Sequence, residues 1–419
     1  MSPFQVMLKP AGSLCNMKCD YCYYLEKADL LSQGCKTGKT FMSDQILEKF
    51  IASYITSQPP GNVSFTWHGG EALIRPLSFY KKALVFQKKY AGNLYSIDNS
   101  IQTNGLLLNE EWCRFFKENN FLVGISLDGS ERQHDKFRRT NGGNNSFSRV
   151  ARGINLLQHH GVNFNVLATV NSYNADEPLE FYHAIKGLGV EYIQFTPIIE
   201  RVGSRANSFA EPEDLSILTR SQDGPVDIPN TITSSPMVPY SITPLQWGYF
   251  TTTLFDEWIK DDVGRIFIQL FDVTLANWMG MSPGLCSMAK YCGRAGVMEW
   301  NGDVFSCDHF VYPRYKLGNI MDKSLEEMMN SEEQIRFGNL KYDALPTQCI
   351  ECEFLFACHG ECPKNRFSHT ADGTPGLNYL CRGYYKFFKH VAPYMDFMKQ
   401  CLMDGKPPAL VMDWIKDFK

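Results

Sequence analysis

Residues 1 to about 200 alternate between short β-rich runs and longer amphipathic stretches, and this alternation limits the fold more than any other feature. The helical patterns include SDQILEKFIASYI, with Ser43 as its N-cap, and NEEWCRFFKEN, with Asn109 as its N-cap. Six strand and helix units in succession predict a parallel sheet with right-handed crossovers, either doubly wound or arranged as a barrel. The expected strands cover residues 4–9, 63–68, 96–104, 121–128, 162–170 and 190–197.

Chemically useful residues follow these strands. In both architectures, ligands bind at the carboxyl ends of the strands. The segments at those ends are a cysteine triplet after the first strand, HGGE (68–71), QTNG (102–105), SLDG (126–129) and TPIIER (196–201). We therefore expect them to form one rim of one barrel.

The cysteine triplet has the spacing C-x3-C-x2-C, at Cys15, Cys19 and Cys22. An ordinary 4Fe-4S cluster takes four thiolates, so three would leave one iron open to a small molecule. Catalytic zinc sites keep an open position for the same reason. The alternative is a zinc site that a distant His or Cys completes.

Eight further cysteines make two complete sets of four ligands, for iron-sulfur clusters or for zinc. They are Cys286, Cys292, Cys307, Cys349, Cys352, Cys358, Cys362 and Cys381. Asn301-Gly302 predicts a hairpin that brings Cys307 back towards the two cysteines before it. Cys35, Cys113 and Cys401 are expected to be ordinary thiols.

Length and charge narrow the class of protein. A chain of 419 residues predicts two domains. The net charge of −4 offers no basic field for nucleic acid or for an anionic membrane. No apolar run is long enough for a signal peptide or a membrane span, which predicts a cytoplasmic protein. Fourteen cysteines in that compartment favour metal or iron-sulfur ligation over disulfides.

The triplet followed by an aromatic residue, together with GGE after the second strand, resembles the radical S-adenosylmethionine superfamily. The resemblance implies a partial (β/α)6 TIM-type barrel and S-adenosyl-L-methionine bound to the open iron. The reduced cluster would cleave this cofactor to methionine and a 5′-deoxyadenosyl radical, which abstracts hydrogen from the substrate. Ala72 stands where the family's GGEP motif has proline.

The same resemblance implies which residues contact the cofactor. They are Tyr21, Gly70, Ser126, Arg138 and Ile199. Glycine lets the backbone approach the methionyl amine, and the Glu of HGGE pins the loop. Arg138 and Ser126 would bind the carboxylate. Two ordinary interpretations stay open: Arg138 as a solvated helix charge, and Ile199 as a core residue.

The later cysteines resemble the SPASM domain, a small cysteine-rich domain with a β-hairpin and a following helix. By that resemblance one 4Fe-4S cluster is held by Cys286, Cys292, Cys307 and Cys362. The other is held by Cys349, Cys352, Cys358 and Cys381. The crossed position of Cys362 comes from the family and not from spacing. The chain would thus carry three 4Fe-4S clusters, and full ligation gives the last two a role in electron transfer.

Over essentially its whole length, the chain resembles the anaerobic sulfatase-maturating enzymes. The resemblance lies in LKPAGSLCNMKCDYCYY, HGGEAL, SIQTNG, FLVGISLDG, CGRAGVMEWNGDVFSCDHFV and KLGNI. It implies oxidation of a Cys or Ser to Cα-formylglycine in an unfolded sulfatase, within a Cys/Ser-x-Pro-x-Arg segment. Asp308 matches the family's proposed base, and His309 is a weaker candidate. A ferredoxin or flavodoxin would donate low-potential electrons, and the sequence does not choose between Cys and Ser.

The expected domains follow from these resemblances. Residues 1–235 form the radical SAM core, 236–285 a linking helix and strand, 286–385 the SPASM domain and 386–419 a C-terminal helix. Within them, the segment 203–245 is rich in Ser, Pro, Thr and Asn and is expected to be a linker or a lid.

Two rival functions remain. A SPASM peptide-crosslinking maturase would share every cluster ligand, but many such enzymes carry a separate N-terminal recognition domain, and the first expected strand here begins at residue 4. A non-catalytic, zinc-binding interaction protein would have no need of HGGE, SLDG and HDKFRR at strand ends.

Overall fold

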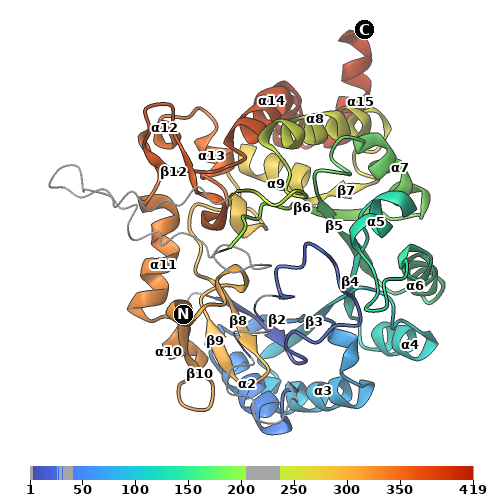
Figure 1. Cartoon of the computed structure of the whole chain (residues 1–419), viewed down its shortest axis with the longest axis vertical. Helices are drawn as coiled ribbons and strands as arrows, with labels where there is room; N and C mark the ends of the chain where they lie inside the picture. The colour runs from blue at the N-terminus through green and yellow to red at the C-terminus, as the bar shows by residue number, and fades with distance from the viewer. Residues whose placement is uncertain (1–2, 26, 28–30, 32–40, 204–235, 419) are drawn as a thin grey trace, which may run out of the picture. The chain divides into compact units, whose positions relative to one another are not determined.

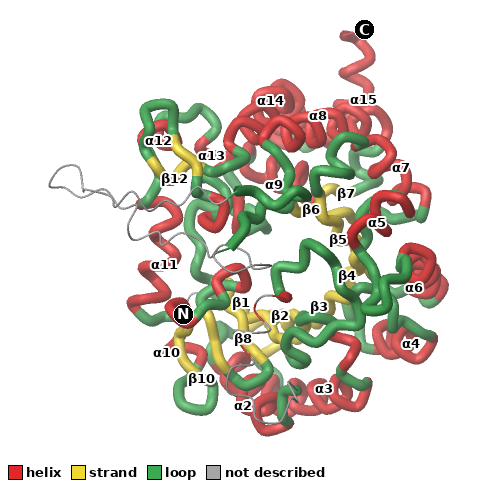
Figure 2. The backbone as a smooth tube through the Cα atoms, viewed as in Figure 1, coloured by secondary structure: helices red, strands yellow, loops and turns green. Residues whose placement is uncertain are grey.

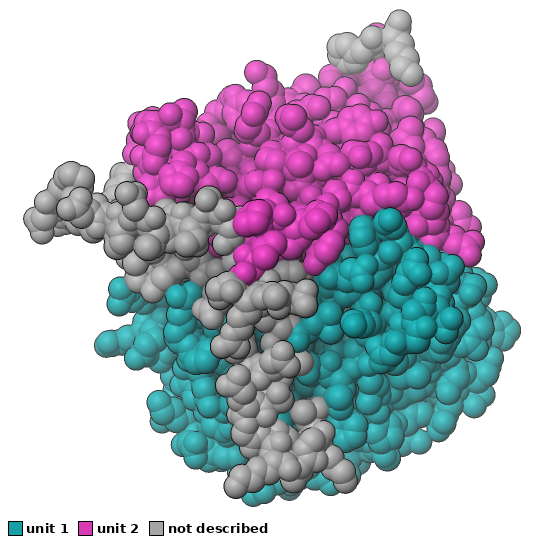
Figure 3. All heavy atoms as spheres, viewed as in Figure 1, with its two compact units in different colours: residues 1–127, 134–166, 293–338 teal, residues 128–133, 167–292, 339–419 magenta. Residues whose placement is uncertain are grey.

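The computed structural model describes the chain except residues 1–2, 26, 28–30, 32–40, 204–235 and 419 (Figure 1, Figure 2). The described residues form two compact units, shown in teal and magenta in Figure 3. Unit 1 comprises residues 1–127, 134–166 and 293–338, and unit 2 comprises residues 128–133, 167–292 and 339–419. These units cut across the domain boundaries expected from the sequence, which stay a prediction. Cys35 and most of the segment 203–245 lie outside the described residues.

Unit 1 alternates strands with helices and then adds three strands from late in the sequence. Its elements are β1 (Gln5–Lys9), α2 (Asp44–Thr56), β2 (Gly61–Trp67), η1 (Ala72–Ile74), α3 (Leu77–Ala91), β3 (Tyr95–Thr103), α4 (Glu110–Glu118), β4 (Leu122–Ser126), α6 (Phe147–His159), β8 (Ala295–Glu299), β9 (Asp303–Phe305), η4 (Asp308–Phe310), η5 (Pro313–Tyr315), β10 (Lys316–Asn319) and α10 (Leu325–Met329).

Unit 2 is mostly helical. Its elements are α7 (Pro178–Gly187), β6 (Tyr192–Pro197), α8 (Pro244–Asp261), β7 (Phe267–Ile268), α9 (Gln269–Trp278), η3 (Cys286–Met288), α12 (Thr347–Ile350), α13 (Leu355–Cys358), η6 (Pro363–Asn365), β11 (Ser368–His369), β12 (Pro375–Leu377), α14 (Cys381–Met403), η7 (Pro408–Leu410), α15 (Val411–Trp414) and η8 (Ile415–Phe418). Three elements have residues in both units: α5 (Glu131–Phe137), β5 (Phe164–Val170) and α11 (Glu332–Asp343).

The strands of unit 1 lie in the order β10, β9, β8, β1, β2, β3 and β4. From β8 to β4 all neighbours are parallel, and β9 and β10 continue the other edge as antiparallel strands. Strand β8 runs beside β1 with Gln5 opposite Ala295 and Lys9 opposite Glu299. The cysteine-bearing hairpin is therefore an extension of the first parallel strands, which the sequence did not indicate.

All six strands expected in the first half of the chain are present, with bounds within a few residues of the prediction. The two N-caps are also confirmed: the Ser43 hydroxyl accepts from Ile46 N at 3.3 Å, and the Asn109 side chain accepts from Trp112 N at 3.0 Å. The hairpin turn forms as expected, with Gly302 at φ +88°.

The strand expected in the linking segment 236–285, at RIFIQLF (265–271), is wrong for most of its length. Only Phe267–Ile268 is extended, and helix α9 begins at Gln269. The apolar run continues into LFDVTLANW, and a short apolar run cannot be assigned to strand or buried helix by periodicity alone. The C-terminal helix, expected from residue 386, begins at Cys381 and ends at Met403.

The inner face of β2 forms the core of unit 1. Phe65 and Trp67 are fully buried and pack on α2 and α3, with ring centroids 5.1 Å apart for Phe65 and Tyr54 and 5.5 Å apart for Trp67 and Tyr80. Side chains of this size contribute roughly 2–3 kcal/mol each to stability on burial.

Among the described helices, none is long and apolar enough to cross a membrane.

Candidate functional site

The loop after β1 carries the cysteine triplet. Cys15, Cys19 and Cys22 are half-buried, and the backbone turns so that Cys22 N donates to Cys19 O at 3.1 Å. Burial raises the pKa of Cys15 to about 11, and the negative charges of Glu71 and Cys22 act in the same direction. Burial also raises the pKa of Cys22. Thiols with raised pKa values need a metal to hold them as thiolates, which fits a cluster-binding loop.

The HGGE loop after β2 packs directly on this loop. Gly70 N donates to Gly12 O at 2.8 Å, and Glu71 N donates to Leu14 O at 2.8 Å. A Cβ added at Gly70 would lie 2.3 Å from Leu14 O and 2.5 Å from Ser13 O. Glycine is therefore required here because two backbones meet.

Glu71 joins the ends of two strands. One carboxylate oxygen accepts from Leu73 N at 2.9 Å and from Thr103 Oγ1 at 2.8 Å, and the other accepts from Asn104 N at 2.8 Å. The Asn104 side chain in turn donates to Asn16 in the cysteine loop at 2.7 Å. Burial raises the pKa of Glu71, and these hydrogen bonds oppose the shift. The prediction that this residue pins the HGGE loop is consistent with these contacts.

The segment after α5 lies along the cysteine loop. Lys18 N donates to Arg139 O at 2.9 Å, and Met17 pairs with Thr140. Arg138 is only 9% exposed, and its guanidinium lies 5.5 Å from the ring centroid of Tyr21. Arg138 is therefore not a solvated helix charge, and the structure brings two of the expected cofactor contacts together.

Two further expected cofactor contacts, Ser126 and Ile199, are described separately. Ser126 ends β4 and is half-buried, and its hydroxyl accepts from Gln102 Nε2 at 3.1 Å. Ile199 belongs to unit 2, where it lies two residues after β6 and is 3% exposed. Its burial fits the core interpretation as well as the binding one.

Asp308, the expected base, is contacted by two lysine side chains and by the hydroxyl of a tyrosine. Its Oδ1 is 2.5 Å from Lys9 Nζ, and its Oδ2 accepts from the Tyr23 hydroxyl at 2.5 Å. Lys27 Nζ donates to the Asp308 carbonyl at 2.7 Å. Burial alone would raise the pKa of Asp308, but the positive charges of Lys9 and Lys27 outweigh it and hold the pKa below its usual range. The carboxylate is thus ionised, and each of its oxygens has one partner.

Lys9 has contacts that the sequence did not predict. Its side chain is fully buried at the carboxyl end of β1, and Nζ lies 3.6 Å from the ring centroid of Tyr24. The Tyr24 hydroxyl donates to Glu299, which faces Lys9 across the β1 and β8 pair. Burial raises the pKa of Glu299 to about 8, and Lys9 opposes this. A lysine at a strand end beside a cysteine loop was the only available signal in the sequence.

Two histidines lie near Asp308. Burial and the charge of Lys9 lower the pKa of His68 to about 4, so it is neutral at physiological pH. Its Nδ1 accepts from Gly69 N at 2.8 Å. The ring of His309 lies 5.8 Å from that of Tyr23. Tyr23 and Tyr24, both without a role in the prediction, are the residues that contact the two buried carboxylates.

The later cysteines divide between the units. Cys307 lies in unit 1, directly before Asp308, and the other seven lie in unit 2. Burial raises the pKa of Cys349 to about 11, with repulsion from Cys358 and Cys352 adding to it. Cys381 has a pKa of about 11 for the same reason, with repulsion from Cys349 and Cys352. These four neighbours are the residues expected to hold one cluster.

Among the residues that the structure describes, no group of three or more His, Cys, Asp or Glu side chains is arranged to hold one ion. A cluster receives each thiolate on a different iron, so its ligands need not converge on one point. Cys113 and Cys401 are buried thiols outside these sets.

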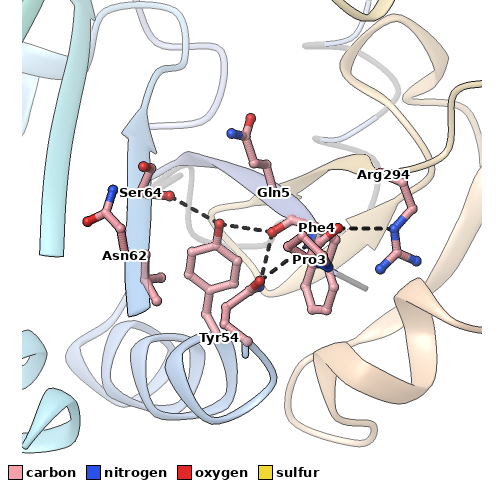
Figure 4. A pocket seen from close by; sticks show the side chains of 9 residues that line it. Pro3, Phe4, Gln5, Tyr54, Asn62, Ser64 and Arg294 are labelled. Carbon is pink, nitrogen blue, oxygen red and sulfur yellow. Dashed lines mark hydrogen bonds between the residues drawn. The ribbon is translucent and has the colours of Figure 1, made fainter. Parts of the chain in front are cut away.

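Unit 1 also contains a cavity of about 300 Å³ at the opposite ends of its strands (Figure 4). Its lining includes Phe4, Tyr54, Ser64 and Arg294. The Tyr54 hydroxyl in α2 donates to the carbonyls of Phe4 and Ser64, and Arg294, directly before β8, donates to the carbonyl of Pro3. Sites in parallel sheets lie at carboxyl ends, so this cavity is not part of the functional site.

Comparisons with known proteins agree with this geometry. The model of the radical SAM superfamily matches residues 10–185, and the model of the SPASM iron-sulfur cluster-binding domain matches residues 291–353. These matches confirm the predicted fold class, a partial barrel followed by a SPASM domain.

Several relatives match over the full length. The chain is 57% identical over 99% of its length to a serine-type anaerobic sulfatase-maturating enzyme of Bacteroides thetaiotaomicron, covering 96% of that protein. It is 30% identical over 96% of its length to a cysteine-type anaerobic sulfatase-maturating enzyme of Clostridium novyi, covering 99% of it. A solved structure described as native anSMEcpe with bound AdoMet and Kp18Cys peptide is 29% identical, with a TM-score of 0.79 over 95% of this chain and 99% of that one.

The contact at Gly70 gives a first testable prediction. Gly70→Ala forces the backbone of residues 13 and 14 away and should destabilise the protein by about 1–3 kcal/mol, with loss of iron from the triplet. Thermal unfolding and iron content measure both effects. Gly187→Ala is the matched control, because a Cβ there meets nothing within 4 Å. Equal behaviour of the two variants would show that the close approach at Gly70 has no role.

Proposed function

The protein belongs to the anaerobic sulfatase-maturating enzymes of the radical SAM superfamily, and we propose that it oxidises a serine of an unfolded sulfatase to Cα-formylglycine. The observation that carries the choice of serine is the 57% identity to a serine-type enzyme, against 30% to a cysteine-type one. The target would lie in a Ser-x-Pro-x-Arg segment, with the corresponding Cys segment as the alternative substrate.

We propose that Cys15, Cys19 and Cys22 hold a 4Fe-4S cluster with one open iron. S-adenosyl-L-methionine would contact Tyr21, Gly70, Ser126, Arg138 and Ile199. When bound, the cluster and cofactor supply the one-electron chemistry that removes a hydrogen atom from the target Cβ. The chain supplies the support: Glu71 fixes the HGGE loop on the cysteine loop, and Arg138 offers a buried planar cation for a carboxylate.

Asp308 accepts the proton of the target hydroxyl in this proposal. Lys9 and Tyr23 hold its two oxygens, so the carboxylate is ionised and has one orientation. Its lowered pKa makes it a weak base, and a serine hydroxyl is a weak acid. Proton transfer must therefore accompany the loss of the electron from the oxidised Cβ, which makes the hydroxyl more acidic.

The remaining eight ligands complete two further 4Fe-4S clusters in the proposal, giving three in all. The first set is Cys286, Cys292, Cys307 and Cys362, and the second is Cys349, Cys352, Cys358 and Cys381. Because Cys307 directly precedes Asp308, the electron and the proton would leave the target at adjacent residues. A ferredoxin or flavodoxin is the proposed electron donor. The many free thiols suit a reducing compartment, which supports a cytoplasmic location.

Replacing Cys15, Cys19 and Cys22 together with Ala should abolish reductive cleavage of S-adenosyl-L-methionine while iron remains in the other sets. The reason is that only this loop leaves an iron open to the cofactor. Methionine and 5′-deoxyadenosine are quantified after dithionite reduction. Retained cleavage would place the cofactor elsewhere.

Asp308→Asn should still form 5′-deoxyadenosine but lower the yield of aldehyde by about 10²–10⁴-fold, because hydrogen abstraction precedes proton loss. Both products are measured in one anaerobic reaction, so 5′-deoxyadenosine also reports that the variant is folded. Asp322→Asn is the control, since Asp322 is exposed. An unchanged aldehyde yield would remove Asp308 as the base.

The function itself is tested with the reconstituted enzyme, cofactor, reductant and matched Ser and Cys peptides. Mass spectrometry should show loss of two hydrogen atoms from the Ser peptide at a higher rate than the change in the Cys peptide, which loses two hydrogen atoms and exchanges its sulfur for an oxygen from water. Faster turnover of the Cys peptide would overturn the serine assignment. A crosslinked peptide without aldehyde would instead identify a crosslinking maturase.

A further inference from the structure

Unit 2 contains two fully buried cations near the later cysteines. Lys341 in α11 is 0% exposed, and Arg366, directly after η6, is 1% exposed. The Lys341 Nζ donates to the carbonyls of Cys286 at 2.6 Å and Ser287 at 2.8 Å, and to that of Ala289. Three acceptors require three N–H donors, so the side chain is an ammonium and not a neutral amine.

Arg366 binds the loop between Cys358 and Cys362. Its guanidinium donates to the carbonyls of all three intervening residues: His359 at 3.0 Å, Gly360 at 2.9 Å and Glu361 at 3.2 Å. It also donates to the Lys341 carbonyl at 2.5 Å. The two cations are thus linked, and we call them the cation pair.

The backbone of that loop is strained. His359, Gly360 and Glu361 have φ values of +46°, +71° and +53°, and two of the three are not glycine. Successive left-handed residues persist only where their surroundings hold them, and the three carbonyls all bind Arg366. Arg366 therefore fixes the conformation that separates Cys358 from Cys362.

The cation pair lacks matching carboxylates. Among the described residues, neither side chain forms an ion pair with a carboxylate. Each hydrogen bond that they donate goes to a backbone carbonyl. Glu361 is the nearby buried carboxylate, and it accepts from Asn365 at 3.0 Å and Asn378 at 2.6 Å. Buried charges without counter-charges are strongly destabilising, so two cations require more negative charge than one carboxylate supplies.

The thiolates around the pair can supply that charge. Burial lowers the pKa of Lys341, and Cys292, Cys362 and Cys286 oppose it. Burial also lowers the pKa of Arg366, with Cys349, Cys358 and Cys362 opposing. Lys341 therefore interacts electrostatically with cysteines of one proposed ligand set, and Arg366 interacts with cysteines of both sets. A cluster with four thiolates is an anion whose reduction potential depends on nearby charge.

We infer that Lys341 and Arg366 are the counter-charges of the two auxiliary iron-sulfur clusters and raise their reduction potentials. The inference rests on the proposed ligand sets. Reduction adds negative charge, so a buried cation stabilises the reduced cluster more than the oxidised one. The pair would make the auxiliary clusters better acceptors of the electron that leaves the substrate. Both residues act through the clusters, so they are positioning residues and not catalytic ones.

Lys341→Gln tests this inference, because it keeps two N–H donors for the carbonyls and removes the charge. Redox titration followed by electron paramagnetic resonance measures the auxiliary clusters in the Cys15, Cys19 and Cys22→Ala background, without substrate. We expect the equilibrium constant for reduction to fall about tenfold or more, which is about 59 mV for one electron. Lys290→Gln is the matched control, since Lys290 is exposed and its charge is screened by water. It should leave the potential unchanged.

Equal potentials in Lys341→Gln and the parent protein would overturn the inference. If Lys341→Gln loses auxiliary iron, Lys341→Arg and Arg366→Lys decide: retained iron with a parental potential supports the role of charge, and loss of iron in both assigns the pair to backbone shape alone. Failure of the ligand sets themselves is separate, because the parent protein would then show no auxiliary signal to titrate.

Discussion

The parallel pairing of β1 with both β2 and β8 is the constraint on which the rest of unit 1 depends. Parallel strands end at the same edge, so the pairing gathers the cysteine loop after β1, the HGGE loop after β2 and the Cys307-Asp308 turn after the hairpin. Lys9 ends the middle strand and contacts Asp308 across this edge. If β8 were shifted by one residue, Glu299 would turn to the other face and Lys9 would lose its neighbours. Register therefore sets the distance between the proposed cofactor site and the proposed base.

Buried charged side chains occur in three settings, which differ in the groups that contact the charge. Glu71 is satisfied by backbone and hydroxyl donors and acts as a structural tie. Asp308 forms an ion pair with Lys9 and accepts a hydrogen bond from Tyr23. Lys341 and Arg366 donate only to backbone carbonyls, and Glu361 is the one buried carboxylate described near them. Only the last arrangement has fewer carboxylates than cations, which is why it points to the thiolate sets.

The sequence predicted what depends on local chemistry. Ser43 and Asn109 cap their helices, six strands lie near their expected bounds, and the Asn301-Gly302 turn forms. It did not predict the pairing of β8 with β1, because residues nearly 300 positions apart leave no local signal of contact. It overestimated the strand at 265–271, because an apolar run suits a buried helix equally well. Lys9, Tyr23 and Arg366 were missed as single residues whose roles appear only when distant loops are brought together.

Cys358 and Cys362 show why spacing alone cannot assign cluster ligands. Four residues apart, they read as one motif, yet the loop between them turns through three successive left-handed residues. Such a turn redirects the chain sharply, so the second cysteine need not face the same way as the first. Repulsion among Cys349, Cys352, Cys358 and Cys381 joins those four, whereas Cys362 is linked to Lys341 together with Cys286 and Cys292. The backbone conformation that Arg366 holds is thus a physical basis for the proposal that one short loop contributes to two ligand sets.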